Sequence, residues 1–392
     1  MKIAAINGIL NQKRGAELAF LNMVKSLKKR GHEIDVFTLS VSEYFENKLG
    51  EDDIPVSSTD FFTGPFGRLF PIRILKDLVG LVYFYKLSKH INNSYDVAFI
   101  HHHDFAPLIM PFLKIPKVYY CQEPPRDYYE TYKRSDRTLK QKLLRAILFI
   151  PLFINKNSDK YLDRYCVKFS DLILSNSDYS REYIWRTYGL FPVTNYLGVD
   201  NKIFNKLDIP KSATIVSIGA IYPAKGHDFM VRSIGLVPEE KRPALTIVGT
   251  GSLNLKQYLV QLAEETDVKL DIKNDLLPDE MCKLYNEAKL VGITYVMPPF
   301  PLAAIESMAC GTPVVGLREG GLREIVTPKT GILTKRSEED FAKAIAYLMD
   351  NPEVSTEMGK GGLERVRKLF TWEKCGENLE KNFKMVLIDR GK

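Results

Sequence analysis

The segment ATIVSIGAIYPAKGHDFMVRSIGLV (residues 213–237) contains a β-rich run, then a loop with two glycines, then a run with helical spacing of its apolar residues. A second β-rich run, ALTIVG (244–249), follows it. Apolar runs that do not alternate with polar residues are typical of parallel strands buried on both faces. This stretch therefore predicts the strand–helix–strand unit of a parallel α/β domain.

The beginning of the chain has the same pattern. KIAAI (2–6) precedes a loop with glycines and a helix that we expect over 16–30. The alternation of strands and helices restarts near residue 212, after a turn-rich linker at 198–210. The chain therefore contains two regions that open in the same way.

Length and composition agree with two folded domains. A chain of 392 residues exceeds one ordinary core, and 45% apolar with 26% charged residues excludes a disordered chain, a collagen-like repeat and a coiled coil. We therefore expect an α/β fold with two doubly wound Rossmann-like domains, 1–199 and 200–372, that face a central cleft. Such sheets bind ligands at the C-terminal ends of their strands.

Cysteine usage and the lack of targeting signals indicate where the protein resides. Five scattered cysteines without a C-x-x-C pair argue against a disulfide scaffold or a structural zinc site and fit a reducing cytoplasm. MKIAAINGIL (1–10) is unlike a secretory signal, and no apolar run is long enough to span a membrane. We expect a cytoplasmic protein that is soluble or peripheral to a membrane.

The net charge of +7 lies almost entirely in the first half. Residues 1–200 carry 28 Lys and Arg against 22 Asp and Glu, whereas residues 201–392 carry 27 against 26. The basic run 133–145 leads into an apolar patch, and 61–85 mixes aromatic and basic residues. Both patterns favour an anionic membrane surface, with a solvated helix face as the alternative. Nucleic acid is not expected, because the basic run lacks aromatic residues to stack bases.

The stretch PPFPLAAIESMACGTPVVGLREGGLREIV (298–326) carries the clearest chemical signal. Its loop leads into a helix expected to begin near Ala303, with Glu306 about one turn inside. Free N–H groups at a helix start attract phosphate, and a carboxylate one turn further can accept hydrogen bonds from ribose hydroxyls. The alternative is an ordinary loop–helix–strand unit with a solvent-facing Glu.

Motifs along nearly the whole chain resemble the retaining, nucleotide-sugar-dependent glycosyltransferases of family 4, which have the GT-B fold. The motifs are RGAE (14–17), YYCQEPPR (119–126), SNSDYSREYI (175–184), LGVD (197–200), SIGAIYPAKGHDF (217–229), IVGTGS (247–252), ESMACGTPVVG (306–316) and GGLREIV (320–326). Their order and spacing are more specific than any one of them. The resemblance also implies that the last helix, expected over 371–387, returns to the first domain, so that residues 373–392 are expected to belong to that domain.

The resemblance assigns site residues in both domains. Donor-binding roles fall on Gly219, Lys225, Gly249, Lys273, Asn274, Leu302, Ala303, Ala304 and Glu306, with Lys225 and the amides on the diphosphate and Glu306 on ribose. Catalytic roles fall on Gly15, His103, Gln122 and Lys225, and acceptor-side roles on Arg14, His101, Glu123 and Arg126. No metal ligand is expected, since in an extended chain only two of the three consecutive histidines at 101–103 share a face.

Several positions depart from the family pattern. A Glu that normally contacts the donor sugar is replaced by Pro298, and a Gly three residues later by Pro301. The usual cation after the strand is Ala220, and Gln122 stands where relatives often have His. These departures imply altered donor choice, weaker catalysis, or a catalytically silent GT-B protein that senses sugar nucleotides or partners an active transferase.

The expected function is transfer of a hexose from a UDP- or GDP-sugar, with retention and without metal or other cofactor. The expected acceptor is a lipid-linked or cell-surface glycan precursor. Because the first domain is expected to bind acceptor and holds the excess charge, we expect a protein peripheral to the inner face of a membrane.

Overall fold

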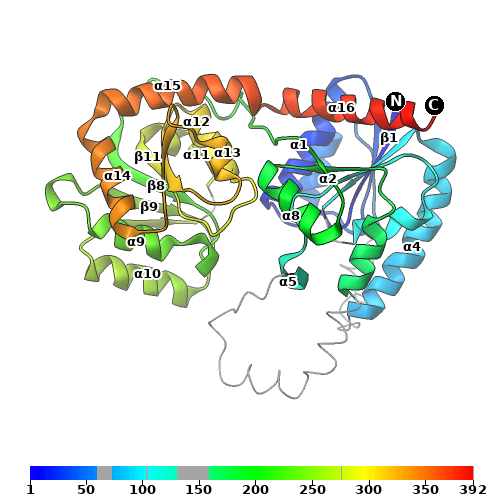
Figure 1. The fold of residues 1–392 in the computed structure, drawn as a ribbon, viewed down its shortest axis with the longest axis horizontal. Coiled ribbons are helices and arrows are strands. Elements are labelled where there is room, and N and C mark those ends of the chain that lie inside the picture. Colours follow the sequence, from blue (N-terminus) through cyan, green and yellow to red (C-terminus); the bar gives the residue numbers. More distant parts are fainter. Residues whose placement is uncertain (60–72, 103–104, 130–158, 275, 392) are drawn as a thin grey trace, which may run out of the picture. The chain divides into compact units, whose positions relative to one another are not determined.

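The computed structural model describes residues 1–59, 73–102, 105–129, 159–274 and 276–391 (Figure 1). The chain divides into an N-terminal unit, Met1–Asn195 with Cys375–Lys392, and a C-terminal unit, Tyr196–Lys374. Each unit carries one parallel sheet between helices, which confirms the expected class of two Rossmann-like domains. The boundary between the two units lies after Asn195, whereas the sequence predicted a domain boundary after residue 199.

The sheet of the N-terminal unit has the strand order β3-β2-β1-β4-β5-β6-β7. Its strands are β1 (Lys2–Asn7), β2 (Glu33–Phe37), β3 (Val56–Ser57), β4 (Val97–His101), β5 (Lys117–Tyr120), β6 (Leu172–Ser175) and β7 (Val193–Thr194). The connecting helices include α1 (Gly15–Lys29), α2 (Glu43–Gly50), α4 (Arg73–Ser94), η1 (Ala106–Phe112), α5 (Arg126–Tyr129) and α8 (Asp178–Tyr188).

Alternating side chains of β4 face two different layers of helices. Ala98 and Ile100 lie in a buried cluster with residues of α4, η1 and α8. Phe99 points to the other face, where its ring centroid lies 6.2 Å from that of Phe20 in α1 and 5.5 Å from that of Phe383. The strand is thus buried on both faces, as its unbroken apolar run predicted.

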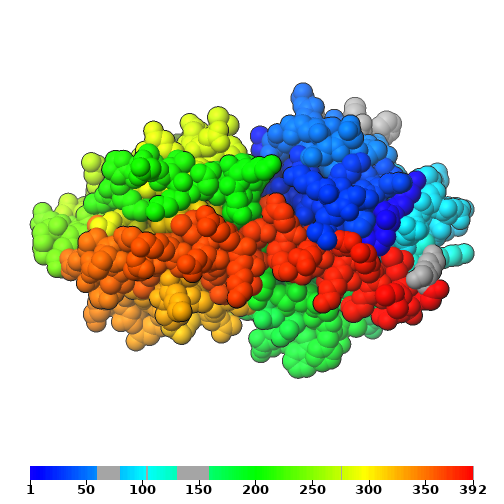
Figure 2. Space-filling model, turned by 90° about the horizontal axis from the view of Figure 1, so that it is seen from above, coloured from blue at the N-terminus to red at the C-terminus, as the bar shows by residue number. Residues whose placement is uncertain are grey.

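The C-terminal helix α16 (Trp372–Asp389) packs on the N-terminal unit. In Figure 2 this red helix lies beside the blue N-terminal segment. Glu380 of α16 accepts a hydrogen bond of 2.5 Å from Nε of Arg30, at the end of α1. The predicted return of the last helix to the first domain is therefore confirmed.

The sheet of the C-terminal unit has the order β10-β9-β8-β11-β12-β13. Its strands are β8 (Ser212–Ile218), β9 (Ala244–Val248), β10 (Leu270–Lys273), β11 (Ala288–Ile293), β12 (Val314–Leu317) and β13 (Gly331–Thr334). Its helices are η2 (Pro223–Lys225), α9 (His227–Gly235), η3 (Glu239–Lys241), α10 (Leu253–Glu265), α11 (Pro278–Glu287), α12 (Leu302–Ala309), α13 (Leu322–Ile325), α14 (Glu338–Asp350) and α15 (Pro352–Leu369).

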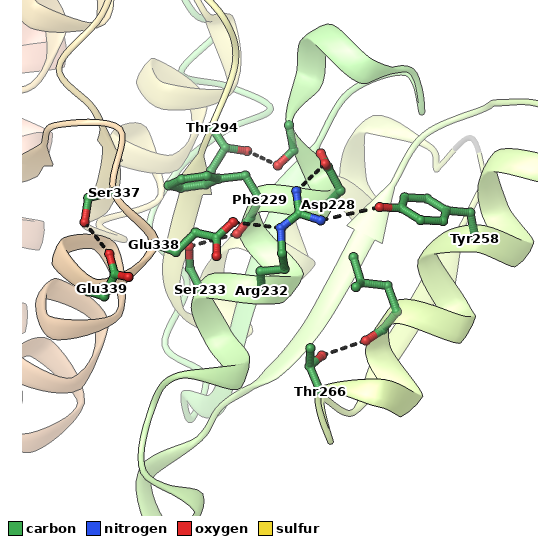
Figure 3. A network of polar contacts seen from close by, with 12 residues as sticks. Asp228, Phe229, Arg232, Ser233, Tyr258, Thr266, Thr294, Ser337, Glu338 and Glu339 are labelled. Carbon is green, nitrogen blue, oxygen red and sulfur yellow. Dashed lines mark hydrogen bonds and ion pairs between the residues drawn. The ribbon is translucent and has the colours of Figure 1, made fainter. Parts of the chain in front are cut away.

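Helices α9, α10 and α14 cover one face of this sheet, and α11, α12 and α15 lie on the other (Figure 1). Arg232 joins the first group, because its guanidinium binds Asp228 at 2.6 Å, Glu338 at 2.7 Å and the Tyr258 hydroxyl at 3.4 Å (Figure 3). This network fixes α9, and α9 begins directly after the loop that holds Lys225.

Each sheet has one point where the strand order reverses. In the N-terminal unit it lies between β1 and β4, and in the C-terminal unit between β8 and β11. At each of these points, the loops after the two strands leave toward opposite faces of the sheet. Open α/β sheets bind ligands between such loops, at the C-terminal ends of the strands. These two switch points therefore position the candidate sites.

Most of the two segments that led to the membrane prediction lies outside the residues that the structure describes. The basic run 133–145 lies outside the described residues, and of 61–85 only the part in α4 is described. Among the helices of the described ranges, none combines the length and the apolar character needed to cross a bilayer.

Candidate functional site

Two glycines shape the edge of the C-terminal sheet at the ends of β8 and β9. Gly219 has φ +142°, and its N–H donates to the Val248 carbonyl at 2.9 Å. A Cβ on Gly249 would lie 2.0 Å from the Gly219 carbonyl oxygen. Only glycine permits such a close approach of two backbones, so this edge offers main-chain groups to a ligand.

Lys225 is held at the switch point by residues that follow β11. Its ammonium lies 3.8 Å from the ring centroid of Tyr295, a cation–π contact, and the Tyr295 hydroxyl donates to the Ile218 carbonyl. The Thr294 hydroxyl donates to the Lys225 carbonyl at 3.0 Å. The predicted diphosphate-binding lysine is therefore fixed where β8 and β11 end.

His227 forms hydrogen bonds that position Gly219, at the start of the same loop. Sequence reasoning did not find this role. It is buried, with Nε2 3.2 Å from the Gly219 carbonyl and Nδ1 3.2 Å from the Ser217 hydroxyl. Burial lowers its pKa to about 4. The neutral ring thus donates from Nε2 to Gly219 and accepts at Nδ1 from Ser217, which positions Gly219 without adding charge.

The loop before α12 is poor in N–H donors, because Pro298, Pro299 and Pro301 have none. The Ala304 N–H donates back to the Pro301 carbonyl at 3.0 Å. The N–H groups of Leu302 and Ala303 have no hydrogen-bond partner within the described chain. Of the three predicted amides, two are therefore available at the helix start, where the helix dipole favours an anion.

Glu306 lies one turn further along α12. Its Oε2 accepts a hydrogen bond of 2.7 Å from the hydroxyl of Tyr285, a buried residue of α11. Burial raises the pKa of Glu306, and the hydrogen bond from Tyr285 acts in the opposite direction. Tyr285 orients the carboxyl group and leaves Oε1 without a partner among the described side chains, so Glu306 can accept from a hydroxyl of a ligand.

The residues expected near the nucleotide base lie on the neighbouring strands. Lys273 ends β10, its carbonyl accepts from the Gly249 N–H at 2.9 Å, and its ammonium lies 3.6 Å from Asp271. The Asn274 side chain accepts from the Lys256 ammonium at 2.5 Å. The structure thus brings Gly219, Gly249 and Lys273 along one edge through adjacent strands.

An ion pair that sequence reasoning missed holds the loop from Met297 to Pro301. Arg336 binds both carboxylate oxygens of Glu319 at 2.8 Å, and Glu319 accepts from the Met297 N–H at 3.3 Å. Although burial acts to raise it, Arg336 keeps the pKa of Glu319 below its ordinary value. Glu319 and Arg336 follow β12 and β13, and no spacing in the sequence links such loops.

In the N-terminal unit, side chains occupy the switch point. His101 ends β4 and is fully buried, with Nδ1 3.1 Å from the Asn7 amide and Nε2 3.1 Å from the Gln122 amide. Asn7 Oδ1 accepts from the Ile9 N–H, so its NH₂ group donates to Nδ1. The atom of Gln122 placed against Nε2 is its amide nitrogen. Because Nδ1 accepts from Asn7, a neutral ring carries its proton on Nε2, so the hydrogen bond requires the amide of Gln122 to turn its oxygen to the ring, which frees its NH₂ group as a donor.

The other predicted residues of this unit lie on neighbouring loops. Arg14 precedes α1 and Gly15 begins it, and both are exposed. Glu123 and Arg126 form an ion pair of 2.8 Å after β5. His103 lies outside the described residues. Within the part of the chain that is described, no three His, Cys, Asp or Glu side chains group as metal ligands would.

Two family descriptions match the chain. "Glycosyltransferase Family 4" matches residues 13–202, and "Glycosyl transferases group 1" matches residues 199–365. An uncharacterized glycosyltransferase of Methanocaldococcus jannaschii is 25% identical over 362 residues, which cover 90% of each chain. A D-inositol 3-phosphate glycosyltransferase of Saccharomonospora viridis is 28% identical over 236 residues, which are 54% of each chain.

Solved structures share the fold over nearly the full length. Anabaena HepE, in complex with UDP and glucose, has a TM-score of 0.75 at 16% identity and covers 98% of this chain and all (100%) of its own. Sucrose-phosphate synthase from Thermosynechococcus elongatus has a TM-score of 0.76 at 18% identity, with 99% of each chain covered. The two family descriptions together match residues 13–365 and so include parts of both units. The chain therefore belongs to the glycosyltransferases of the family 4 type, with the GT-B fold.

Proposed function

We propose that the protein is a retaining glycosyltransferase that moves a hexose from a UDP- or GDP-sugar to a lipid-linked or cell-surface glycan precursor. The observation that carries the proposal is the edge at β8 and β11. Lys225 lies in the segment that follows β8, and the two free amides of α12 and Glu306 lie in the segment that follows β11. The strands β8 and β11 are neighbours in the sheet. A cation, a helix start and a carboxylate match diphosphate and ribose.

The same groups supply the chemistry of the proposed reaction. Lys225 and the amides of Leu302 and Ala303 stabilise the negative charge that grows on the departing diphosphate. They do so as fixed positive charge and dipoles, so we propose a reaction without metal. The departing phosphate oxygen takes the proton of the acceptor hydroxyl as that hydroxyl attacks from the same face, which retains the anomeric configuration.

The proposed donor and acceptor classes have different support. HepE binds UDP and glucose, and the same fold here presents the described edge, which favours a UDP-sugar over a GDP-sugar. For the acceptor, the support is the positive charge of the first half together with a structural neighbour that is a lipopolysaccharide outer core galactosyltransferase, WaaB, at a TM-score of 0.69. The proposed place of action is the inner face of a membrane.

A thermal-shift panel of UDP, GDP and their hexose conjugates tests the donor, because a bound ligand raises the melting temperature by mass action. Donors that shift the melting temperature are then incubated with lipid-linked glycan acceptors, and NMR of the product reads the anomeric configuration. Inversion would refute retention. Nucleotide binding without turnover of any donor would identify the catalytically silent alternative.

The ribose contact is tested by Glu306→Ala. We expect about tenfold weaker UDP binding, which corresponds to about 1.4 kcal/mol. Glu264→Ala, at an exposed position of α10 in the same unit, is the matched control and should leave the affinity unchanged. If both variants bind UDP with equal affinity, Glu306 does not contact the ribose.

A further inference from the structure

The C-terminal unit has a polar pocket at the edge of its sheet opposite to Lys225. The pocket has a volume of about 360 Å³ and lies where β8 and β11 begin, beside the first turn of α15. Lys211, Lys289 and Ser355 are among its lining residues. Its volume falls within the range of small-molecule sites, about 300–1,000 Å³.

The pocket is positively charged. Within the described chain, Lys211, Lys289 and the nearby Lys206 have no carboxylate in ion-pair range. The Lys211 ammonium donates to the carbonyls of Asn286 at 3.1 Å and Ala288 at 2.9 Å and to the Thr312 hydroxyl at 2.8 Å. These neutral acceptors use its three N–H groups but leave its charge uncompensated. Burial of the ammonium lowers its pKa to about 8, and Lys206 and Lys289 act in the same direction.

The start of α15 adds the positive end of a helix dipole and one hydroxyl donor. Pro352 occupies the first helical position, and the dipole of this 18-residue helix directs its positive end to the pocket. Ser355 is only 5% exposed, lines the pocket, and its hydroxyl has no partner among the described residues. The hydroxyl is not among the enclosed polar atoms of the described chain, so it is open to the pocket and can donate to a polar ligand there. Glu353 of the same turn is exposed and is not a lining residue.

We propose that this pocket binds a small phosphate-bearing anion, either inorganic phosphate or the phosphate group of a sugar phosphate. The Lys289 ammonium binds the phosphate directly, the Ser355 hydroxyl donates to it, and Lys211 contributes its charge from the base of the pocket. The site is separate from the proposed donor edge, since it lies at the N-terminal ends of the strands whose C-terminal ends carry Lys225.

Isothermal titration calorimetry with inorganic phosphate and with glucose 6-phosphate tests the proposal on the full chain. Lys289→Gln should weaken binding by roughly tenfold or more, as expected for a lost hydrogen bond to a charged group, and Ser355→Ala by a smaller factor. Lys343→Gln removes an exposed cation from α14 and is the matched control. Tighter binding of glucose 6-phosphate than of phosphate would show that the pocket also holds the sugar.

Lys225→Met separates this pocket from the donor edge. The proposal requires that Lys289→Gln still weakens phosphate binding when it is combined with Lys225→Met, which removes the cation of the donor edge. Binding that is lost in Lys225→Met and kept in Lys289→Gln would place the phosphate only at the donor edge and overturn the proposal. So would the absence of binding of both probes at millimolar concentration. Circular dichroism and urea unfolding of Lys289→Gln establish that a loss of binding is not a loss of fold.

Discussion

The two switch points of the molecule have the same topology but are built from different groups. At β8 and β11 the C-terminal unit presents backbone, because Gly219 and Gly249 approach so closely that no side chain fits between them. At β1 and β4 the N-terminal unit presents side chains, because Asn7, His101 and Gln122 form a buried chain of hydrogen bonds. One architecture therefore supports two kinds of recognition.

This difference agrees with the proposal that the C-terminal unit binds the donor and the N-terminal unit binds the acceptor. In the proposed function, backbone amides and a single lysine recognise the diphosphate that UDP- and GDP-sugars share, and their geometry does not depend on which sugar is attached. Side-chain amides such as that of Gln122 can be exchanged by mutation without disturbing the strands, which suits a unit that selects among acceptors.

The largest effect is expected for Gly249→Ala. The added Cβ would lie 2.0 Å from the Gly219 carbonyl, so β8 and β9 must separate at their ends. We expect a loss of about 3 kcal/mol in the free energy of unfolding, the upper end for overpacking, together with loss of UDP binding. Urea unfolding measures the first and calorimetry the second. Gly50→Ala is the control, since no atom lies within 4 Å of its Cβ position.

Lys225→Met should weaken UDP binding by about 1.5–3 kcal/mol, the cost of losing a hydrogen bond to a charged group. Arg14→Met, the corresponding change in the loop after β1, should cost much less, because Arg14 is exposed at the start of α1. Calorimetric titration with UDP compares the two variants. Similar losses in both would mean that the N-terminal loop also holds the diphosphate, and the contrast between the units would fail.

Much of this contrast could be predicted from the sequence. The apolar runs at residues 2–6 and 213–219 marked the first strand of each unit, and the loops after them carried Gly15, Gly219 and Lys225. The helix start before Glu306 was expected near Ala303, and α12 begins at Leu302. These features are local, so strand and helix periodicity together with glycine positions were enough to find them.

The supporting contacts could not be predicted, because they join positions far apart in the chain. Tyr285 reaches Glu306 from another helix, and Arg336 reaches Glu319 from the next loop of the sheet. His227 was visible in the sequence as part of AKGHDF, but only the fold shows it beneath Gly219. Side chains that orient others carry no periodic signal, and their partners depend on the tertiary structure.

A third prediction compares two carboxylates with opposite pKa shifts. Burial raises the pKa of Glu306, so its ionised form costs stability above the ordinary carboxyl range. Hydrogen bonds from Lys384 and Arg30 lower the pKa of Glu380 to about 2, so its ionised form adds stability that is lost as the pH falls toward that value. At pH 7, Glu306→Gln should stabilise the protein and Glu380→Gln should destabilise it, by up to about 1 kcal/mol for this surface pair.

Urea unfolding from pH 7 down to pH 3 checks both signs. The gain in Glu306→Gln should shrink as the pH falls below the raised pKa of Glu306 and should disappear below 4.5, the ordinary value of a Glu carboxyl, where Glu306 is protonated in both the folded and the unfolded state. The loss in Glu380→Gln should persist to lower pH and then diminish. A destabilised Glu306→Gln at pH 7 would mean that Glu306 is a stabilising residue rather than one retained for ligand binding.

Arg336→Met tests whether the loop before α12 must be held for catalysis. The pair with Glu319 is partly exposed, so we expect a loss of only about 0.5–1 kcal/mol in the free energy of unfolding. Transfer should fall several-fold more than UDP affinity, since the loop from Met297 to Pro301 leads to the helix start. Lys241→Met removes a single exposed pair, with Asp350 at 2.8 Å, and should change stability alone. Equal transfer rates in both variants would reduce the Glu319 pair to a structural contact.

The smallest effect is expected for Gln122→Met. Methionine keeps the length of the side chain but removes the amide, so the hydrogen bond with His101 is lost together with any contact to an approaching acceptor. We expect the KM for the acceptor to rise about three- to tenfold, the value of one neutral hydrogen bond, with UDP affinity unchanged. Gln257→Met, exposed on α10, is the matched control. A change in UDP affinity instead of acceptor KM would assign donor recognition to the side chains of the N-terminal switch point, because Gln122 would then contact the nucleotide-sugar rather than the acceptor.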